Sequence, residues 1–150
     1  MELILWRHAE AEDGFPDGAR QLTGKGLDQA RRMADWLKPK LPENTRIIVS
    51  PARRTQQTAM ALESDFVTES ALAPGASAHA VLAVAGWPVA GGVVVIVGHQ
   101  PTLGEIAGCL IPVIPAGLQV KKGSVWWIRN EEKDGVIEPK LHAVIYPEML

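Results

Sequence analysis

The stretch LILWRH at residues 3–8 is a short apolar run that ends abruptly in two basic side chains, Arg7 and His8. Two further apolar runs, at residues 47–49 and 93–97, are rich in isoleucine and valine. Continuous rather than alternating hydrophobicity indicates burial on both faces, which is typical of parallel strands covered by helices. The three runs therefore predict the central strands of a sheet with helices on both sides.

Helical patterns separate these predicted strands. The first helix is expected to run from an N-cap at Thr23 to about residue 39. Its apolar residues recur at helical spacing and predict one buried face: Leu27, Ala30, Ala34 and Leu37. Prolines suited to a first turn predict two more helices, at residues 51–62 and 101–110, and residues 76–85 form a weaker fourth. Strands that alternate with helices imply right-handed crossovers and a mainly parallel sheet.

The last third of the chain has a different pattern. Residues 124–129 and 136–146 flank a turn signal at Asp134-Gly135, so they predict a β-hairpin. Pro139 cannot donate a ladder hydrogen bond, so its strand is expected at a sheet edge or a bulge. The expected fold class is α/β: a three-layer α/β/α sandwich whose mainly parallel sheet carries antiparallel edge strands, built as one domain over residues 1–150.

Composition limits the classes of partner. The 150 residues include 15 Lys+Arg and 17 Asp+Glu, a net charge of −2, which disfavours nucleic-acid and membrane-surface binding. The single cysteine, Cys109, excludes an internal disulfide framework and a cysteine-built zinc site. No apolar run approaches the roughly 18 residues of a membrane span, and residues 1–12 lack the pattern of a secretory signal. We therefore expect a cytoplasmic protein, and its oligomeric state stays open.

Basic side chains directly follow each of the three apolar strands. They are Arg7 and His8, then Arg53 and Arg54, then His99. In open α/β sheets ligands bind outside the carboxyl ends of the strands, so these groups are expected to converge. Guanidinium groups match phosphate oxygens, and a neutral imidazole can attack phosphorus. The pattern predicts a phosphoryl site that needs no metal or cofactor, whereas each segment alone is typical of a solvated surface.

Four segments together resemble the motifs of the histidine phosphatase superfamily, which has the phosphoglycerate-mutase-like fold. They lie in the order and spacing of that family, at residues 5–11, 22–30, 50–59 and 97–101. The resemblance implies that His8 is the nucleophile and that Arg7 is its phosphate-clamping neighbour. It further implies that Arg54 and His99 hold the phosphoryl group, and that Arg20 is an additional phosphate ligand, as in small bacterial members.

The departures from the family pattern narrow the expected substrate. Ala9 stands where most members carry glycine, which is similar to the small bacterial phosphohistidine phosphatases, the SixA-like branch. Residues 69–75 carry Pro74 near the place where mutases and sugar bisphosphatases have an acid, and 150 residues leave no room for their lid insertions. An alkoxide needs such an acid to leave, whereas the imidazole of phosphohistidine, with a reference pKa near 6.5, can leave protonated.

The expected function is therefore hydrolysis of phosphohistidine on a histidine-phosphotransfer protein, through a covalent phosphohistidine on the enzyme. One alternative is a phosphatase for small phosphomonoesters or phosphoanhydrides, in which Glu10 or Glu12 would supply the proton. Another is a non-catalytic module that only binds phosphorylated proteins. The pairing of His8 with His99 speaks against that module, because binding alone requires only the arginines.

Overall fold

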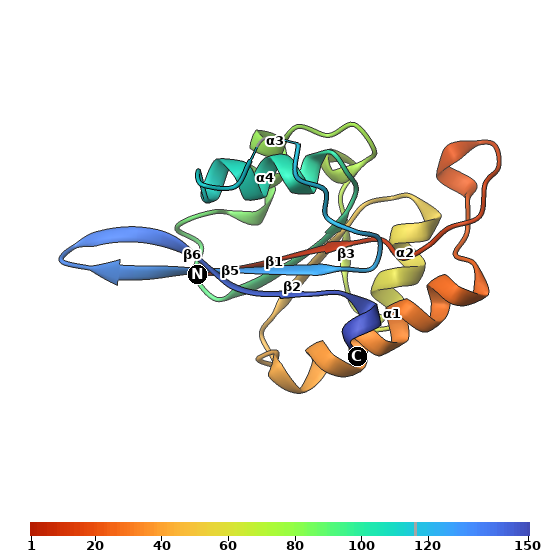
Figure 1. The fold of residues 1–150 in the computed structure, drawn as a ribbon, viewed down its shortest axis with the longest axis horizontal. Helices are drawn as coiled ribbons and strands as arrows, with labels where there is room; N and C mark the ends of the chain where they lie inside the picture. Colours follow the sequence, from red (N-terminus) through yellow and green to blue (C-terminus); the bar gives the residue numbers. More distant parts are fainter. Residues whose placement is uncertain (116) are drawn as a thin grey trace.

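The computed structural model, which describes residues 1–115 and 117–150, is a six-stranded sheet between two layers of helices (Figure 1). The strand order is β3-β2-β4-β1-β5-β6. The parallel strands are β1 (Glu2–Arg7), β2 (Arg46–Val49), β3 (Val67–Thr68) and β4 (Val93–Gly98). β5 (Val125–Lys133) and β6 (Val136–Ile145) add antiparallel strands at one edge. The predicted α/β class with a mainly parallel sheet is confirmed.

The helices divide between the two faces of the sheet. α1 (Gly24–Leu37) and α2 (Arg53–Met60) cover one face, and α3 (Ala78–Ala85) and α4 (Thr102–Leu110) cover the other (Figure 1). Short 3-10 helices lie in the connections, at Asp17–Ala19, Lys38–Lys40, Ser70–Leu72 and Pro147–Met149. No helix in the described ranges is long and apolar enough to cross a membrane.

The central strands of the sheet are buried on both faces, which explains their continuous apolar runs. In β1, Leu3 and Leu5 belong to the core under α3 and α4, whereas Ile4 and Trp6 belong to the core under α1 and α2. β4 is buried along its whole length. The two central strands are therefore held from both sides, and the residues that follow them leave the sheet at well-defined positions.

α1 begins where the sequence predicts, but its buried face is rotated. The Thr23 side chain caps the helix by accepting a hydrogen bond from the Gly26 backbone N–H at 2.9 Å. Leu27 is 51% exposed, so its predicted place in the buried stripe is wrong. The cause is a close approach between Gly26 and the Glu10 backbone, since a Cβ at Gly26 would lie 2.0 Å from the Glu10 carbonyl oxygen. That contact directs the neighbouring Leu27 outward.

The other helices are present, with shifted starts. α2 begins at Arg53 rather than Pro51, because Ala52 is extended (ψ 141°) and its N–H is bonded to the Ser50 hydroxyl at 3.3 Å. α4 begins directly after Pro101, close to its predicted start. α3 begins after Ser77, which caps it through the Ala80 N–H at 3.1 Å.

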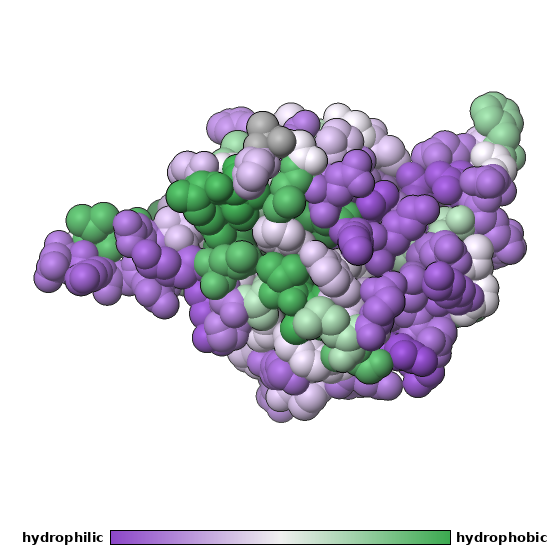
Figure 2. Space-filling model, in the orientation of Figure 1, coloured by the Kyte–Doolittle hydropathy of each residue, from purple (hydrophilic) through white to green (hydrophobic). Residues whose placement is uncertain are grey.

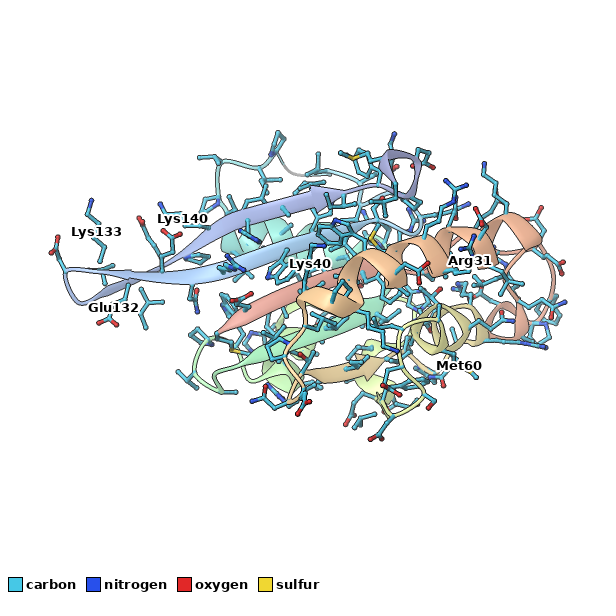
Figure 3. The ribbon with its side chains drawn as sticks, turned by 90° about the horizontal axis from the view of Figure 1, so that it is seen from below. Arg31, Lys40, Met60, Glu132, Lys133 and Lys140 are labelled. Carbon is cyan, nitrogen blue, oxygen red and sulfur yellow. The ribbon has the colours of Figure 1, made fainter. Side chains whose placement is uncertain are left out.

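The C-terminal hairpin is longer than its sequence pattern suggests. Asp134 and Gly135 form the predicted turn with φ of 54° and 78°, and pairing continues up to Lys133 and Val136 on either side of it. The hairpin projects beyond the rest of the sheet and carries Glu132, Lys133 and Lys140 (Figures 1 and 3). Pro139 lies in β6, the edge strand, as expected. β3 was not predicted, because its two residues are both exposed and form no apolar run.

Candidate active site

The carboxyl ends of β1, β2 and β4 lie side by side because these three strands are neighbours in the sheet. The His8 N–H donates to the Gly98 carbonyl at 3.1 Å, and the Ser50 N–H donates to the Val97 carbonyl at 3.1 Å. These bonds place the residue after each strand beside the end of β4. The imidazole rings of His8 and His99 consequently lie 5.3 Å apart between centroids.

The structure brings together four of the residues singled out in the sequence: Arg7, His8, Arg54 and His99. We refer to them as the basic cluster. His8, Arg54 and His99 are only 6%, 4% and 4% exposed, and Arg7 is half-buried. Positive groups buried this close together disfavour one another's charge unless an anion joins them. Accordingly, burial and the neighbouring Arg54 lower the pKa of Arg7.

The hydrogen bonding of His8 defines its tautomer. Its Nδ1 lies 2.7 Å from the Ala9 carbonyl oxygen, which can only accept, so Nδ1 carries the proton and Nε2 carries the lone pair. Burial, with added repulsion from His99, Arg54 and Arg7, lowers the pKa of His8 to about 3, although the bond to Ala9 acts in the opposite direction. The ring is therefore neutral near pH 7, the state required of a nucleophile.

His99 is oriented by two partners. Its Nε2 lies 2.7 Å from the hydroxyl of fully buried Ser50, and its Nδ1 lies 3.4 Å from Nη2 of Arg54. Because a guanidinium group only donates, Nδ1 accepts and the Nε2–H donates to Ser50. Burial and the charge of Arg54 lower the pKa of His99 to about 4. Ser50 opens the sequence motif at residues 50–59, and this contact gives it a defined structural role.

The two arginines are held by backbone and carboxylate oxygens. Arg7 donates from Nη1 to the Val120 carbonyl at 2.9 Å, and Arg54 donates from Nη1 to the Asp17 carbonyl at 2.9 Å. The Nε–H groups of both arginines are buried and make no hydrogen bond within the described residues. A buried donor without an acceptor costs about 1–3 kcal/mol. An anion that accepts from both Nε–H groups would remove this cost.

Asp17 is a site residue that the sequence analysis missed. Its carboxylate accepts from Nη2 of Arg54 at 3.1 Å and from Nη1 of Arg20 at 3.1 Å. These bonds, the one from Arg20 most strongly, lower the pKa of Asp17. A carboxylate is not expected at a phosphate site, so only its spacing of three residues from Arg20 could have indicated it.

Arg20, predicted as a further phosphate ligand, reaches the basic cluster only through Asp17. Its Nε donates to the Glu12 carbonyl at 2.7 Å, and none of its hydrogen bonds within the described residues involves Arg7, His8 or His99. The guanidinium of Arg20 therefore lies at the margin of the cluster, where its charge is already paired with Asp17.

The loop after β1 is fixed by side chains from the other motifs. The Ala9 N–H donates to the Thr58 hydroxyl at 3.1 Å, and the Thr58 hydroxyl donates to the Arg54 carbonyl at 2.7 Å. The Gly123 N–H donates to the His8 carbonyl at 2.9 Å. Glu10, a candidate acid, accepts from the Thr23 hydroxyl at 2.8 Å and thereby supports the start of α1. Within the described ranges, no group of three or more His, Cys, Asp or Glu side chains could hold a metal ion.

Comparison with known proteins places this fold and site in a family. The model of the histidine phosphatase superfamily (branch 1) matches residues 3–75. An uncharacterised protein of Picosynechococcus sp. is 37% identical over 117 residues, which cover 71% of each protein. This chain belongs to the histidine phosphatase superfamily.

Within this superfamily, the chain is similar to SixA proteins. It is 42% identical over 59 residues to the phosphohistidine phosphatase SixA of Escherichia coli (strain K12), a match that spans 39% of this chain and 37% of that protein. A structure of the protein histidine phosphatase SixA complexed with tungstate aligns over 99% of both chains, with a TM-score of 0.83 and 25% identity. The predicted phosphoglycerate-mutase-like fold is confirmed, and the chain is SixA-like.

Proposed function

We propose that this histidine phosphatase hydrolyses phosphohistidine on a phosphotransfer protein, with His8 as the nucleophile and Arg7, Arg54 and His99 as the groups that hold the phosphoryl oxygens. One observation carries the proposal: a neutral imidazole with its Nε2 lone pair available lies beside two guanidinium groups whose buried Nε–H donors have no acceptor within the described residues. That the related SixA structure was solved with tungstate, a tetrahedral oxyanion, supports an anion site of this kind.

In the first step Nε2 of His8 attacks phosphorus, and the bond from phosphorus to the substrate imidazole breaks. The arginine donors offset the charge on the phosphoryl oxygens. The incoming dianion also favours the protonated form of His99, because an opposite charge raises a nearby pKa. His99 already has a proton on Nε2, so the proton it gains goes to Nδ1, which then donates to a phosphoryl oxygen.

In the second step water attacks the phosphorus of the phosphorylated His8. Because Nδ1 keeps its proton in the bond to the Ala9 carbonyl, the phosphorylated ring is cationic. It departs from phosphorus as a neutral imidazole, the oxygen of water goes to phosphate, and the surplus proton goes to solvent. His8 returns to its starting tautomer without rotation of the ring.

The carboxylates around the basic cluster favour an imidazole leaving group over an alkoxide. An alkoxide requires a protonated acid, yet the bonds from Arg20 and Arg54 lower the pKa of Asp17 and keep it ionised. Glu10 is engaged by the Thr23 hydroxyl. A departing imidazole, with its reference pKa near 6.5, can take its proton from solvent. We place this reaction in the cytoplasm, with which a single free cysteine is compatible.

The test measures phosphate release from a phosphorylated histidine-phosphotransfer domain by the wild type and by His8→Ala. A small phosphomonoester and EDTA are included in parallel reactions. We expect release only by the wild type, mainly from the protein, and undiminished by EDTA. Release by His8→Ala would refute the covalent scheme. Preference for the small ester would favour the phosphomonoester alternative, and no turnover of any substrate would favour a phospho-binding module.

A further inference from the structure

A constrained loop stands at the rim of the basic cluster. Residues 12–21, here called the rim loop, lie in the connection between β1 and α1. The base of the loop is closed by the antiparallel bridge between Ala11 and Leu22 and by a hydrogen bond from the Glu12 N–H to the Gln21 carbonyl at 2.8 Å. Figure 1 shows this loop projecting at the carboxyl end of the sheet.

The rim loop is tied to the basic cluster at its centre. Arg54 donates both to the carbonyl of Asp17 and to its carboxylate, and Arg20 donates to the same carboxylate. A loop paired at its base and bonded at its centre has few conformations open to it. Its tip is therefore presented in a fixed position relative to His8.

The tip of this loop is an aromatic side chain with nothing packed on it. Phe15 is 98% exposed, more than any other large hydrophobic residue among those described. Figure 2 shows a small hydrophobic tip on the projecting loop, next to a largely hydrophilic surface. An aromatic side chain buries about 150–250 Å² when it is covered, so this one retains a large unused capacity for apolar contact.

A shallow pocket of about 220 Å³ lies beside Phe15, between the rim loop and the first residue of α2. Its charged lining residues are balanced in number, because the acids Glu12 and Asp13 are matched by the bases Arg20 and Arg53. The balance gives an ionic partner no net attraction there. The contact available at this rim is the apolar one offered by Phe15 and Pro16.

We propose that Phe15 is an apolar anchor that docks against the surface of the folded protein carrying the phosphohistidine, an inference that rests on the proposed function. The phosphoryl group is held within the basic cluster, whereas Phe15 lies at the tip of the rim loop, whose central Asp17 is bonded to Arg54. A single phosphorylated amino acid engages the cluster alone. A folded protein that inserts its phosphohistidine brings the surface around that residue onto the rim, where it covers the ring of Phe15.

The experiment compares two substrates that share the scissile bond and differ in size: a phosphorylated histidine-phosphotransfer domain and free phosphohistidine. The variants are Phe15→Ala, Phe15→Leu and the control Val89→Ala, an 86% exposed apolar residue in the connection that precedes β4. Both positions of change, Phe15 and Val89, are exposed, so the fold is retained. We expect Phe15→Ala to lower kcat/KM about tenfold for the domain, through KM, and to leave free phosphohistidine unchanged. For the domain, the kcat/KM of Phe15→Leu should lie between the values of the wild type and Phe15→Ala, and the kcat/KM of Val89→Ala should equal that of the wild type.

Equal loss on both substrates, or no loss with the domain, would overturn the role of Phe15 and leave the proposed function standing. A wild type that hydrolyses neither substrate, or only free phosphohistidine, would overturn both proposals. A change in oligomeric state on Phe15→Ala, measured by light scattering, would assign the ring to contact between copies of this chain and would also overturn the anchor.

Discussion

The two ends of the sheet carry ionisable side chains in opposite environments. At the carboxyl end, His8, Arg54 and His99 are buried, and their side chains are hydrogen-bonded to the Ala9 carbonyl, the Asp17 carbonyl and the Ser50 hydroxyl, respectively. At the other end the β5-β6 hairpin projects into solvent, and its charges form exposed pairs such as Lys140 with Glu138 at 2.9 Å. Exposed pairs are worth only about 0–1 kcal/mol, whereas buried charges are costly unless they are satisfied.

The difference indicates which charges serve the chemistry. The hairpin charges can be exchanged at little cost, because water already solvates them. In the basic cluster, burial and neighbouring positive groups lower the pKa values of Arg7 and His8, and two Nε–H donors have no acceptor within the described residues, a cost that an anion relieves. Substitutions at the two ends should therefore differ in their effects on activity far more than in their effects on folding.

The largest contrast is expected from His8→Ala, paired with Lys140→Ala on the hairpin. Without Nε2 no phosphoryl-enzyme forms, so kcat should fall about a thousandfold or more, as is typical when a nucleophile is removed. Lys140→Ala should keep wild-type turnover. Phosphate release and mass spectrometry of the trapped phosphoprotein measure the two effects. A phosphorylated intermediate in His8→Ala would place the nucleophile elsewhere.

Arg54→Lys tests whether geometry, rather than charge alone, distinguishes the basic cluster. A lysine keeps the positive charge but loses the planar fork that contacts both the backbone carbonyl and the carboxylate of Asp17, so kcat/KM should fall about a hundredfold. The matched control is Arg31→Lys, on the outer surface of α1 (Figure 3), where exposed ion pairs tolerate the change. Steady-state kinetics of both variants check this. Equal activities would mean that charge suffices at position 54.

The sequence predicted the parts of the molecule that local patterns control. The buried strands, the capped start of α1 at Thr23 and the Asp134-Gly135 turn all depend on residues close together in the chain. The errors depend on contacts between distant segments. Leu27 is directed outward because Gly26 packs on the Glu10 backbone, and that approach has no signature in helical periodicity.

The candidate site divides in the same way. Arg7, His8, Arg54 and His99 follow strands or begin a helix, so parallel topology alone is enough to bring them together. Asp17 lies in an exposed loop, and its bonds to Arg54 and Arg20 arise only after that loop has folded back onto α2. The two-residue strand β3 could not be predicted either. It forms by pairing with β2, and its own two residues show no strand pattern.

The buried histidines should also make stability depend on pH. The pKa values of His8 and His99, about 3 and about 4 in the folded protein, lie below their ordinary 6.5, so the unfolded chain binds more protons below pH 6.5. Stability is therefore complete above pH 6.5 and falls as the pH drops toward 4, by on the order of 2 kcal/mol per histidine between pH 7 and pH 5. Urea unfolding at the two pH values measures this.

The variants His8→Asn and His99→Asn sharpen the pH comparison, because each removes one titrating ring from the basic cluster. Each should reduce the difference in unfolding free energy between pH 7 and pH 5 relative to the wild type. A difference that stays the same in both variants would attribute the acid sensitivity to other groups. NMR provides a direct check, since the ring signals of His8 and His99 should not titrate between pH 8 and pH 5.

The smallest effect is expected from Asp17→Asn. Asp17 lies at the boundary between the buried basic cluster and the exposed surface. Asp17 is more than half exposed, yet it pairs with the buried Arg54. Removing its charge leaves the backbone bond to Arg54 in place and frees positive potential for an incoming anion, so inorganic phosphate should inhibit two- to fivefold more strongly, the size of an exposed ion pair. Inhibition assays with phosphate measure this, with Asp28→Asn on α1 as a control. Weaker inhibition would instead mean that the Asp17 carboxylate is needed to orient Arg54, so that the rim loop is part of the phosphate site.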